Sequence, residues 1–99
     1  MRSRSIAILT LFVLLAAPVR QAGADPTFLP NTDMMDFSYR HFFLPKPWPR
    51  LCQEACAIDA ACNNWTFLHE GALGPLAVCY LKSGTPVPRP DTCCTSGAK

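Results

Sequence analysis

Six cysteines in the order C-x3-C-x5-C-x16-C-x13-C-C constrain the fold of this 99-residue chain more than any other feature. They are Cys52, Cys56, Cys62, Cys79, Cys93 and Cys94. In a small exported chain such a set is read as a disulfide framework, and six cysteines allow 15 connectivities. The spacing therefore predicts a small disulfide-stapled domain, and nothing in it names a ligand.

The first 24 residues have the features of a cleavable signal peptide. Arg2 and Arg4 give a positive start, residues 6–19 form an apolar stretch, and Ala22-Gly23-Ala24 supplies the small residues that a signal peptidase requires. The apolar stretch is shorter than the roughly 20 residues of a membrane span. We therefore expect residues 1–24 to be removed, leaving a secreted or periplasmic protein without a membrane span.

The charge of the mature chain argues against a polyanionic partner. Three of the nine basic residues belong to the predicted signal peptide, so six remain against seven acids. No run of Lys or Arg survives, which leaves no electrostatic footprint for nucleic acid, heparin-like polyanions or anionic lipid. The 75 residues from 25 to 99 are also too few for a large core, so the domain needs its disulfide staples.

The first half of the mature chain predicts a strand followed by a helix. Residues 25–35 contain Pro26, Pro30 and Asn31 and are expected to form an irregular lead-in to a domain of residues 36–99. Aromatic density over residues 36–43 favours a strand. The prolines of residues 45–49 end it, and Pro49 suits the first turn of a helix predicted from about residue 50 to residue 58.

Two further strands are predicted over residues 63–68 and 78–82. Alternation places Cys79 and Leu81 on one face of the second strand, with Tyr80 and Lys82 on the other. If Cys79 bonds to the helix, Tyr80 faces away from it. Alternate prolines predict an extended, polyproline-like path over residues 84–90, and residues 93–96 are the candidate for a final strand. The expected fold is a helix on a small, mostly antiparallel sheet, in the α+β class.

The order of the cysteine, helix and strand motifs along the chain resembles the PAN/apple domain family, in particular its short bacterial branch. The resemblance covers residues 31–99, and Asp33 with residues 36–43 is similar to the opening strand of the family. It rests on Cys52-x3-Cys56-x5-Cys62, Trp65-Thr66-Phe67, Cys79-Tyr80-Leu81-Lys82 and Cys93-Cys94-Thr95-Ser96-Gly97. It implies one helix cradled by a curved antiparallel sheet.

The resemblance also implies a disulfide pattern. In the family the first helical cysteine bonds to the later strand and the second to the strand just after the helix. Here this means Cys52 with Cys79 and Cys56 with Cys62. Cys93 and Cys94 then bond to each other, or one of them reaches the helix in a different connectivity. Many larger apple domains also join their termini through an early cysteine, which this chain lacks, so its ends are expected to fray.

We expect no enzymatic activity, no metal and no cofactor. The cysteine spacings of three and five differ from the C-x2-C of zinc knuckles, and His41 and His69 lie far from either pair. The chain has no C-x-x-C redox motif and no G-x-S-x-G elbow. The adjacent pair Cys93-Cys94 is a candidate redox switch, but a structural role is favoured.

Aromatic side chains are the candidates for ligand contact. Nine of the ten aromatics lie in the mature chain, and a small sheet under one helix cannot bury them all. We select Tyr80, Trp48, Trp65 and Phe42, although Trp65 is better explained as core. Such rings suit a sugar ring or a protein partner. As the resemblance implies, we expect a non-enzymatic module that binds protein or carbohydrate. The alternative is a structural, stabilising envelope protein with no discrete ligand site.

Overall fold

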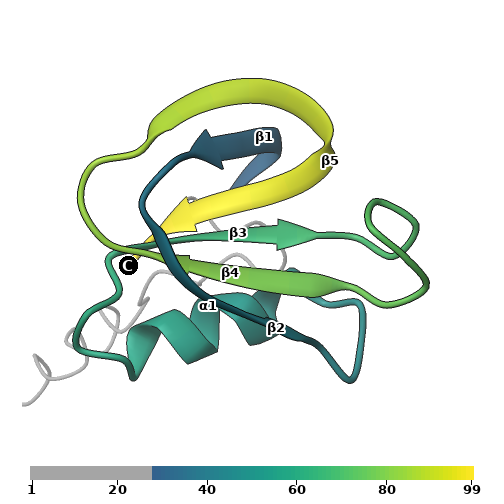
Figure 1. The fold of residues 1–99 in the computed structure, drawn as a ribbon, viewed down its shortest axis with the longest axis horizontal. Coiled ribbons are helices and arrows are strands. Elements are labelled where there is room, and N and C mark those ends of the chain that lie inside the picture. Colours follow the sequence, from purple (N-terminus) through teal and green to yellow (C-terminus); the bar gives the residue numbers. More distant parts are fainter. Residues whose placement is uncertain (1–27) are drawn as a thin grey trace, which may run out of the picture.

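A computed structural model describes residues 28–99, so the predicted signal peptide lies outside the described residues. These residues form five strands and one helix: β1 (Phe28–Met35), β2 (Ser38–Phe43), α1 (Pro49–Ala57), β3 (Asn64–Leu68), β4 (Val78–Lys82) and β5 (Val87–Ala98). The strands form one antiparallel sheet in the order β1-β5-β3-β4-β2 (Figure 1). The predicted α+β fold, one helix on an antiparallel sheet, is confirmed.

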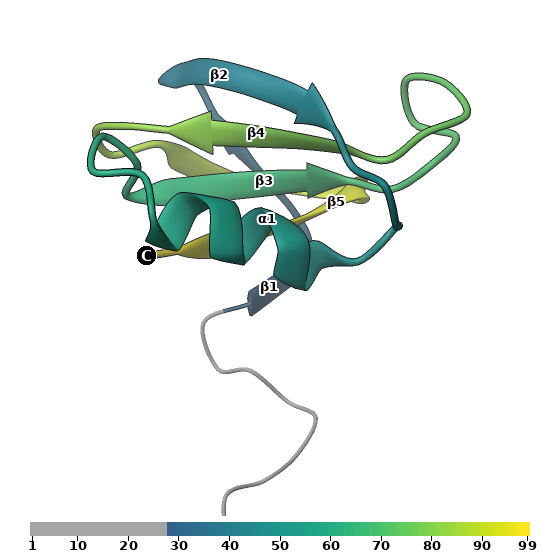
Figure 2. The same cartoon turned by 90° about the horizontal axis from the view of Figure 1, so that it is seen from below.

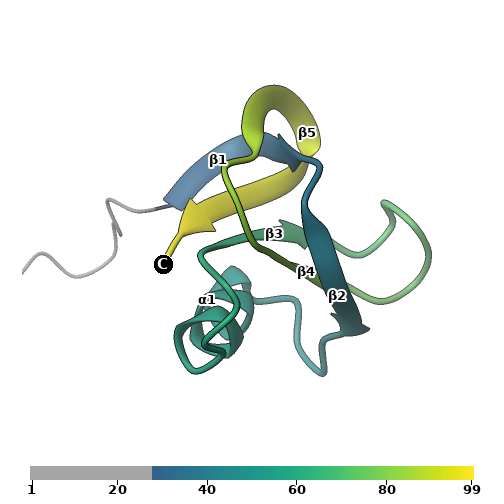
Figure 3. The same cartoon turned by 60° about the vertical axis from the view of Figure 1, so that its left-hand side comes forward.

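The elements lie in three layers (Figure 3). α1 packs along β3 and β4 on one face of the sheet, as Figure 2 shows. On the other face β5 bends away from the sheet and carries β1 with it (Figure 1). Residues 94–98 of β5 pair with β3, whereas residues 87–90 pair with residues 32–35 of β1. We call this second pair of segments the overhanging ribbon.

Helix α1 begins where the proline-rich loop ends, because Pro49 is tolerated in the first helical turn. Cys52 and Cys56 are one turn apart on the same face, and both are fully buried against the sheet. Arg50 and Glu54 form an ion pair of 2.9 Å on the exposed face. The predicted helix is therefore confirmed, displaced by one residue toward the N-terminus.

The core lies between α1 and the sheet. Trp65 of β3 and Leu81 of β4 are fully buried there, together with the helical cysteines. Phe28 packs edge-on against Trp65, with 5.1 Å between the ring centroids. Because side chains alternate along a strand, Thr66 and Tyr80 lie on the opposite, helix-free face. The alternation predicted for β4 is confirmed.

Two disulfides fasten α1 to its surroundings. Cys52 bonds to Cys79 of β4, and Cys56 bonds to Cys62 just before β3. The third disulfide joins the neighbours Cys93 and Cys94 within β5. These are the pairs implied by the family resemblance, and the connectivity in which Cys93 or Cys94 reaches the helix is not adopted.

The irregular lead-in predicted for residues 25–35 is wrong for residues 28–35, which form β1. The strand is irregular next to Pro30, where its register shifts between Pro30 and Thr32 and Asn31 has a φ of 51°. The strand continues on both sides because pairing with β5 overrides local propensity. Phe28 pairs with Gly97, so strand pairing joins the first and last segments of the described residues.

One long strand, β5, replaces the extended path and the short final strand that were predicted separately. Pro88 and Pro90 are paired with Met34 and Thr32 of β1. Alternate residues of a strand direct their backbone N–H groups to the same edge, and this half of β5 has a neighbour on only one edge. The missing N–H groups of the prolines are therefore tolerated.

Candidate functional site

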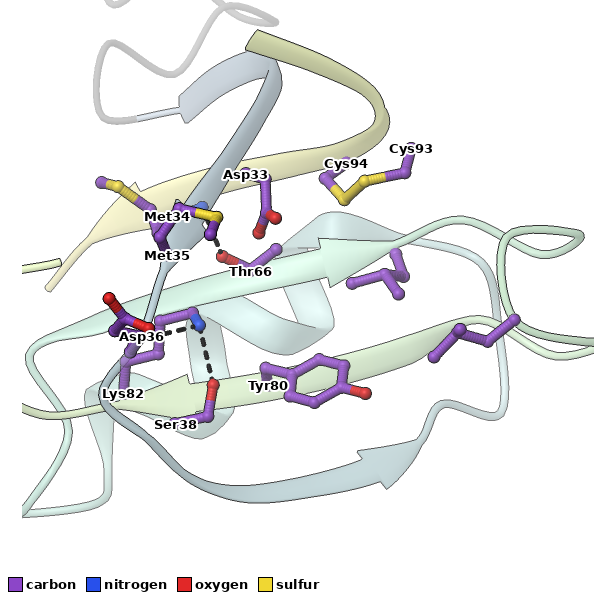
Figure 4. Close-up of a pocket in the computed structure, with 12 residues that line it drawn as sticks. Asp33, Met34, Met35, Asp36, Ser38, Thr66, Tyr80, Lys82, Cys93 and Cys94 are labelled. Atoms are coloured by element: carbon purple, nitrogen blue, oxygen red, sulfur yellow. Dashed lines mark hydrogen bonds between the residues drawn. A yellow bond between two sulfur atoms is a disulfide. The ribbon is translucent and has the colours of Figure 1, made fainter. Parts of the chain in front are cut away.

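An open cavity of about 320 Å³ lies on the helix-free face, between the overhanging ribbon and strands β3 and β4 (Figure 4). Its volume is at the lower end for pockets that hold small molecules. Its polar lining comes from Asp33, Asp36, Ser38, Thr66 and Lys82. Its less polar lining comes from Met34, Met35, Leu68, Leu73, Tyr80, Cys93 and Cys94.

A chain of buried hydroxyls fixes the overhanging ribbon to β3. The Ser96 hydroxyl donates to the Thr32 carbonyl oxygen at 2.8 Å, so the Thr66 hydroxyl is the donor in its 2.7 Å bond with Ser96. Thr66 Oγ1 in turn accepts from the Met34 backbone N–H at 3.4 Å. Thr66 is 1% exposed, so a broken bond leaves a polar group unpaired and away from water. This series of hydrogen bonds therefore fixes the position of the overhanging ribbon relative to β3.

Lys82 brings a buried amine to the cavity, with only 4% of the residue exposed. Its Nζ donates to Ser38 Oγ at 2.7 Å and to the Asp36 carbonyl oxygen at 3.3 Å. Burial lowers the pKa of Lys82, and the negative charges of Asp33 and Asp36 oppose that shift. An ammonium has three N–H donors, of which two have these acceptors. Two of the three N–H groups of the Lys82 ammonium are therefore accounted for by acceptors within the protein.

The Tyr80 ring lies beside this amine on the cavity side of β4 (Figure 4). Its ring centroid is 5.8 Å from Lys82 Nζ, a cation–π geometry. The His41 ring of β2 stacks on it with 5.2 Å between centroids and 25° between the planes. Tyr80 is half-buried, so part of its surface remains available. These contacts hold an aromatic surface in a fixed orientation.

The overhanging ribbon contributes an acceptor opposite this amine. Figure 4 shows the Asp33 carboxylate directed from β1 into the cavity. Its partner is Arg89, whose Nη2 is 3.9 Å from Asp33 Oδ2; the Arg89 side chain is exposed and the Asp33 side chain is half-buried, so the pair is weak. The lining of this one open cavity therefore includes an ammonium group, a carboxylate group and an aromatic ring.

The other sequence-predicted aromatics do not join Tyr80. Trp48 is 46% exposed, but it precedes α1, and the Arg50 guanidinium lies 5.5 Å from its ring centroid. Phe42 is half-buried and packs against the core. Trp65 is fully buried, so its selection as a ligand contact is wrong. It belongs to the core because it shares the helix-facing side of β3 with Phe67.

Of the residues that line the cavity, sequence reasoning selected only Tyr80, and the main contributors that it missed are Asp33, Lys82 and the Cys93–Cys94 disulfide. Lys82 had a usable signal, since alternation places it on the same face as Tyr80 in an otherwise apolar strand. Asp33 had none, because its strand was not predicted. The disulfide reaches the cavity through the bend of β5, which no local pattern reveals.

Within residues 28–99, no group of three His, Cys, Asp or Glu side chains is placed to hold a metal ion. No helix of the same region has the length and apolar character needed to cross a membrane.

A scan against protein-family models matches the PAN domain over residues 32–82, just over half of the chain. The match includes α1, β3, β4 and the two disulfides that fasten the helix. The chain therefore belongs to the PAN domain family, whose members are generally protein- or carbohydrate-interaction modules and not typically enzymes. Searches of curated proteins and of solved structures found no match. The matched region ends before β5, so the Cys93–Cys94 pair lies outside it.

Proposed function

We propose that this protein is an exported, non-enzymatic binding module that holds an uncharged sugar residue in the cavity of the helix-free face. One observation carries the proposal: Tyr80, Lys82 and Asp33 line the same open cavity of about 320 Å³. A sugar ring presents an apolar face, which packs on an aromatic ring, and a rim of hydroxyls, which both donate and accept hydrogen bonds.

The charges of the lining favour an uncharged ligand. A negatively charged group in the cavity would lie close to the carboxylates of Asp33 and Asp36, and a positively charged group would lie close to the buried ammonium of Lys82. A hydroxyl group meets neither repulsion, because it accepts from an ammonium and donates to a carboxylate. The same lining therefore supports a carbohydrate better than an ionic ligand.

Export to the periplasm or the cell exterior is part of the proposal. All six cysteines are in disulfides, and none in the described region is free. Disulfides persist in oxidising compartments and are rare in the cytosol. The predicted signal peptide of residues 1–24 supports the same location.

The test is an NMR titration of the oxidised, exported protein with methyl glycosides of neutral hexoses and N-acetylhexosamines. We expect backbone amide shifts at Thr66, Tyr80 and Lys82. Tyr80→Ala should weaken binding by about tenfold or more, since a ring contact is typically worth that much. Trp48→Ala is the matched control, because Trp48 lies outside the cavity, and it should bind like the wild type. Flat titrations with every glycoside would refute the carbohydrate proposal.

A protein partner is the second candidate, favoured by exposed apolar side chains outside the cavity. Phe43 is 69% exposed on β2, an edge strand of the sheet, and Ile58 just after α1 is 88% exposed. Such side chains favour association with another chain, without a discrete ligand site. In that case glycoside titrations stay flat, and Phe43→Ser rather than Tyr80→Ala abolishes co-purification of a partner from the exported fraction.

A further inference from the structure

The Cys93–Cys94 disulfide connects no two elements of the fold. It joins residues one apart, whereas the other two disulfides join residues 27 and 6 apart. The entropic stabilisation from a disulfide grows with the number of residues in the loop that it closes. The bond between Cys93 and Cys94 encloses no residue, so clamping the fold does not explain it.

This disulfide is part of the cavity wall. Figure 4 shows the two sulfurs on β5, above β3 and across the cavity from Tyr80. Leu68, which pairs with Cys94, and the exposed Leu73 also line the cavity. Cys94 is 3% exposed and Cys93 is half-buried. A pair of bonded sulfurs is a soft, polarizable surface that packs well on rings and apolar groups.

The backbone around the disulfide is held by its neighbours. The Cys93 N–H donates to Asp91 Oδ1 at 3.1 Å, and the His69 N–H donates to the Cys93 carbonyl oxygen at 3.2 Å. Cys94 pairs in register with Leu68 of β3. None of these contacts involves a sulfur atom, so we expect the strand to keep its place when the disulfide is broken.

Reduction would change what these side chains present to the cavity. Adjacent side chains of a regular strand point to opposite faces, and the Cys93–Cys94 bond holds both sulfurs on one side. Once the bond is broken, Cys94 keeps its inward position while Cys93 is free to turn outward. The apolar wall then loses one of its two sulfurs, and the sulfur that remains carries a thiol hydrogen.

We propose that the Cys93–Cys94 disulfide is a ligand-contacting wall of the cavity whose reduction releases the bound sugar residue and leaves the fold intact. This inference rests on the proposed function of the cavity. It gives the module two binding states, an oxidised state that retains its ligand and a reduced state that does not.

The reaction is a thiol–disulfide exchange with a dithiol reductant. One reductant thiolate attacks Sγ of Cys93, the more exposed residue of the pair, and Sγ of Cys94 leaves as a thiolate that takes up a proton. The second reductant thiolate attacks the mixed disulfide and releases the Cys93 thiol. The reductant ends as a disulfide, and two electrons and two protons end on the protein. The four cysteines of the other two disulfides are buried, so the exchange selects this pair.

The first experiment treats the native, oxidised protein with increasing dithiothreitol, followed by alkylation and peptide mapping without further reduction. We expect Cys93 and Cys94 to be alkylated while Cys52–Cys79 and Cys56–Cys62 remain bonded. Alkylation of Cys52–Cys79 or Cys56–Cys62 before Cys93–Cys94, the vicinal pair, would overturn the inference.

The second experiment repeats the methyl glycoside titration on oxidised protein, selectively reduced protein and the variant Cys93→Ser/Cys94→Ser. We expect the last two to bind about tenfold more weakly, with folded-state NMR spectra retained. Cys56→Ser/Cys62→Ser is the matched control, because it removes a disulfide that does not line the cavity, and its affinity should be unchanged. If the vicinal variant does not fold, the selectively reduced wild type decides the outcome.

The outcomes separate this inference from the proposed function. Glycoside affinity that survives both reduction and Cys93→Ser/Cys94→Ser, while Tyr80→Ala abolishes it, would overturn the inference and leave the proposed function standing. Absence of glycoside binding by the oxidised wild type would overturn both. Loss of affinity on reduction that reoxidation restores would support both.

Discussion

The cavity depends on a few polar residues that are buried, whereas the polar residues of a solvent-facing strand are normally exposed. Thr66 and Ser96 are buried polar residues whose hydroxyls connect two layers of the fold. Lys82 is a buried amine held by a serine hydroxyl and a backbone carbonyl, with no ion pair among residues 28–99. Each is more expensive to bury than an apolar residue, and each lies at the cavity or next to it.

Removing the Thr66 hydroxyl should weaken the fold. Thr66→Val keeps the shape of the side chain but leaves the Met34 N–H without an acceptor and the Ser96 hydroxyl without its donor. We expect the free energy of unfolding to fall by about 1–3 kcal/mol, measured by urea denaturation. Thr32→Val is the control, because the Thr32 hydroxyl bonds only to the nearby Pro30 carbonyl on the surface, and it should cost less than about 0.5 kcal/mol. Equal losses in the two variants would contradict the role of the hydroxyl chain.

His69 should make stability depend on pH. Its Nδ1 lies 3.0 Å from the Glu70 carbonyl oxygen and its Nε2 lies 3.0 Å from that of Thr92, so only the doubly protonated ring donates to both. These bonds raise the pKa of His69 above 6.5, while partial burial acts in the opposite direction. A raised folded-state pKa contributes stability that is complete below about pH 6.5 and is lost as pH rises through the folded-state value.

The measurement is the urea midpoint of wild type and His69→Ala between about pH 5 and 8. We expect the difference between the two proteins to shrink as pH rises. A difference in urea midpoint that stays constant across this pH range would show that protonation of the His69 ring does not stabilise the fold.

At the scale of elements, the sequence predicted what local patterns determine. The helix and strands β3 and β4 were predicted within one residue because cysteine spacing, a proline start and side-chain alternation all act over short distances. Strand β1 and the first half of β5 were missed because Pro30, Pro88 and Pro90 argue against a strand locally. They form one because each supplies the other with a partner, which is a contact between distant parts of the chain. Tyr80 was predicted for the site by alternation, whereas Asp33 depended on that missed pairing.

The three disulfides should differ in their contribution to stability. On the chain-entropy view, loss of Cys52–Cys79 should cost roughly 3–4 kcal/mol and loss of Cys56–Cys62 about 2 kcal/mol, because the first closes a longer loop. Loss of Cys93–Cys94 should cost least, since it closes no loop. Urea denaturation of the three paired Cys→Ser variants would give this order. A vicinal variant less stable than the Cys52–Cys79 variant would contradict it.

At the scale of the whole molecule, we expect β1 to be part of the folding unit. Without it, the outer edge of β5 is unpaired, Phe28 no longer covers Trp65, and the overhanging ribbon loses one of its two segments. A domain of this size has only about 3–5 kcal/mol of stability from its core, so the loss is large in proportion. The boundary predicted at residue 36 would therefore cut through the domain.

Shortening the chain tests this statement. A protein of residues 36–99 should fail to give a folded NMR spectrum, whereas residues 28–99 should give one with all three disulfides formed. A well-dispersed spectrum from residues 36–99 would show that β1 is an accessory to a fold that stands without it.

The pairing of Phe28 with Gly97 has a practical consequence. It places the entry and exit of the described chain side by side at one end of the sheet, separated by about the 5 Å between paired strands (Figure 3). A domain whose two chain ends are adjacent is suited to insertion into a surface loop of an unrelated host protein, because the two ends of the host loop need not move apart. The cavity would then be carried into the host protein together with the inserted domain.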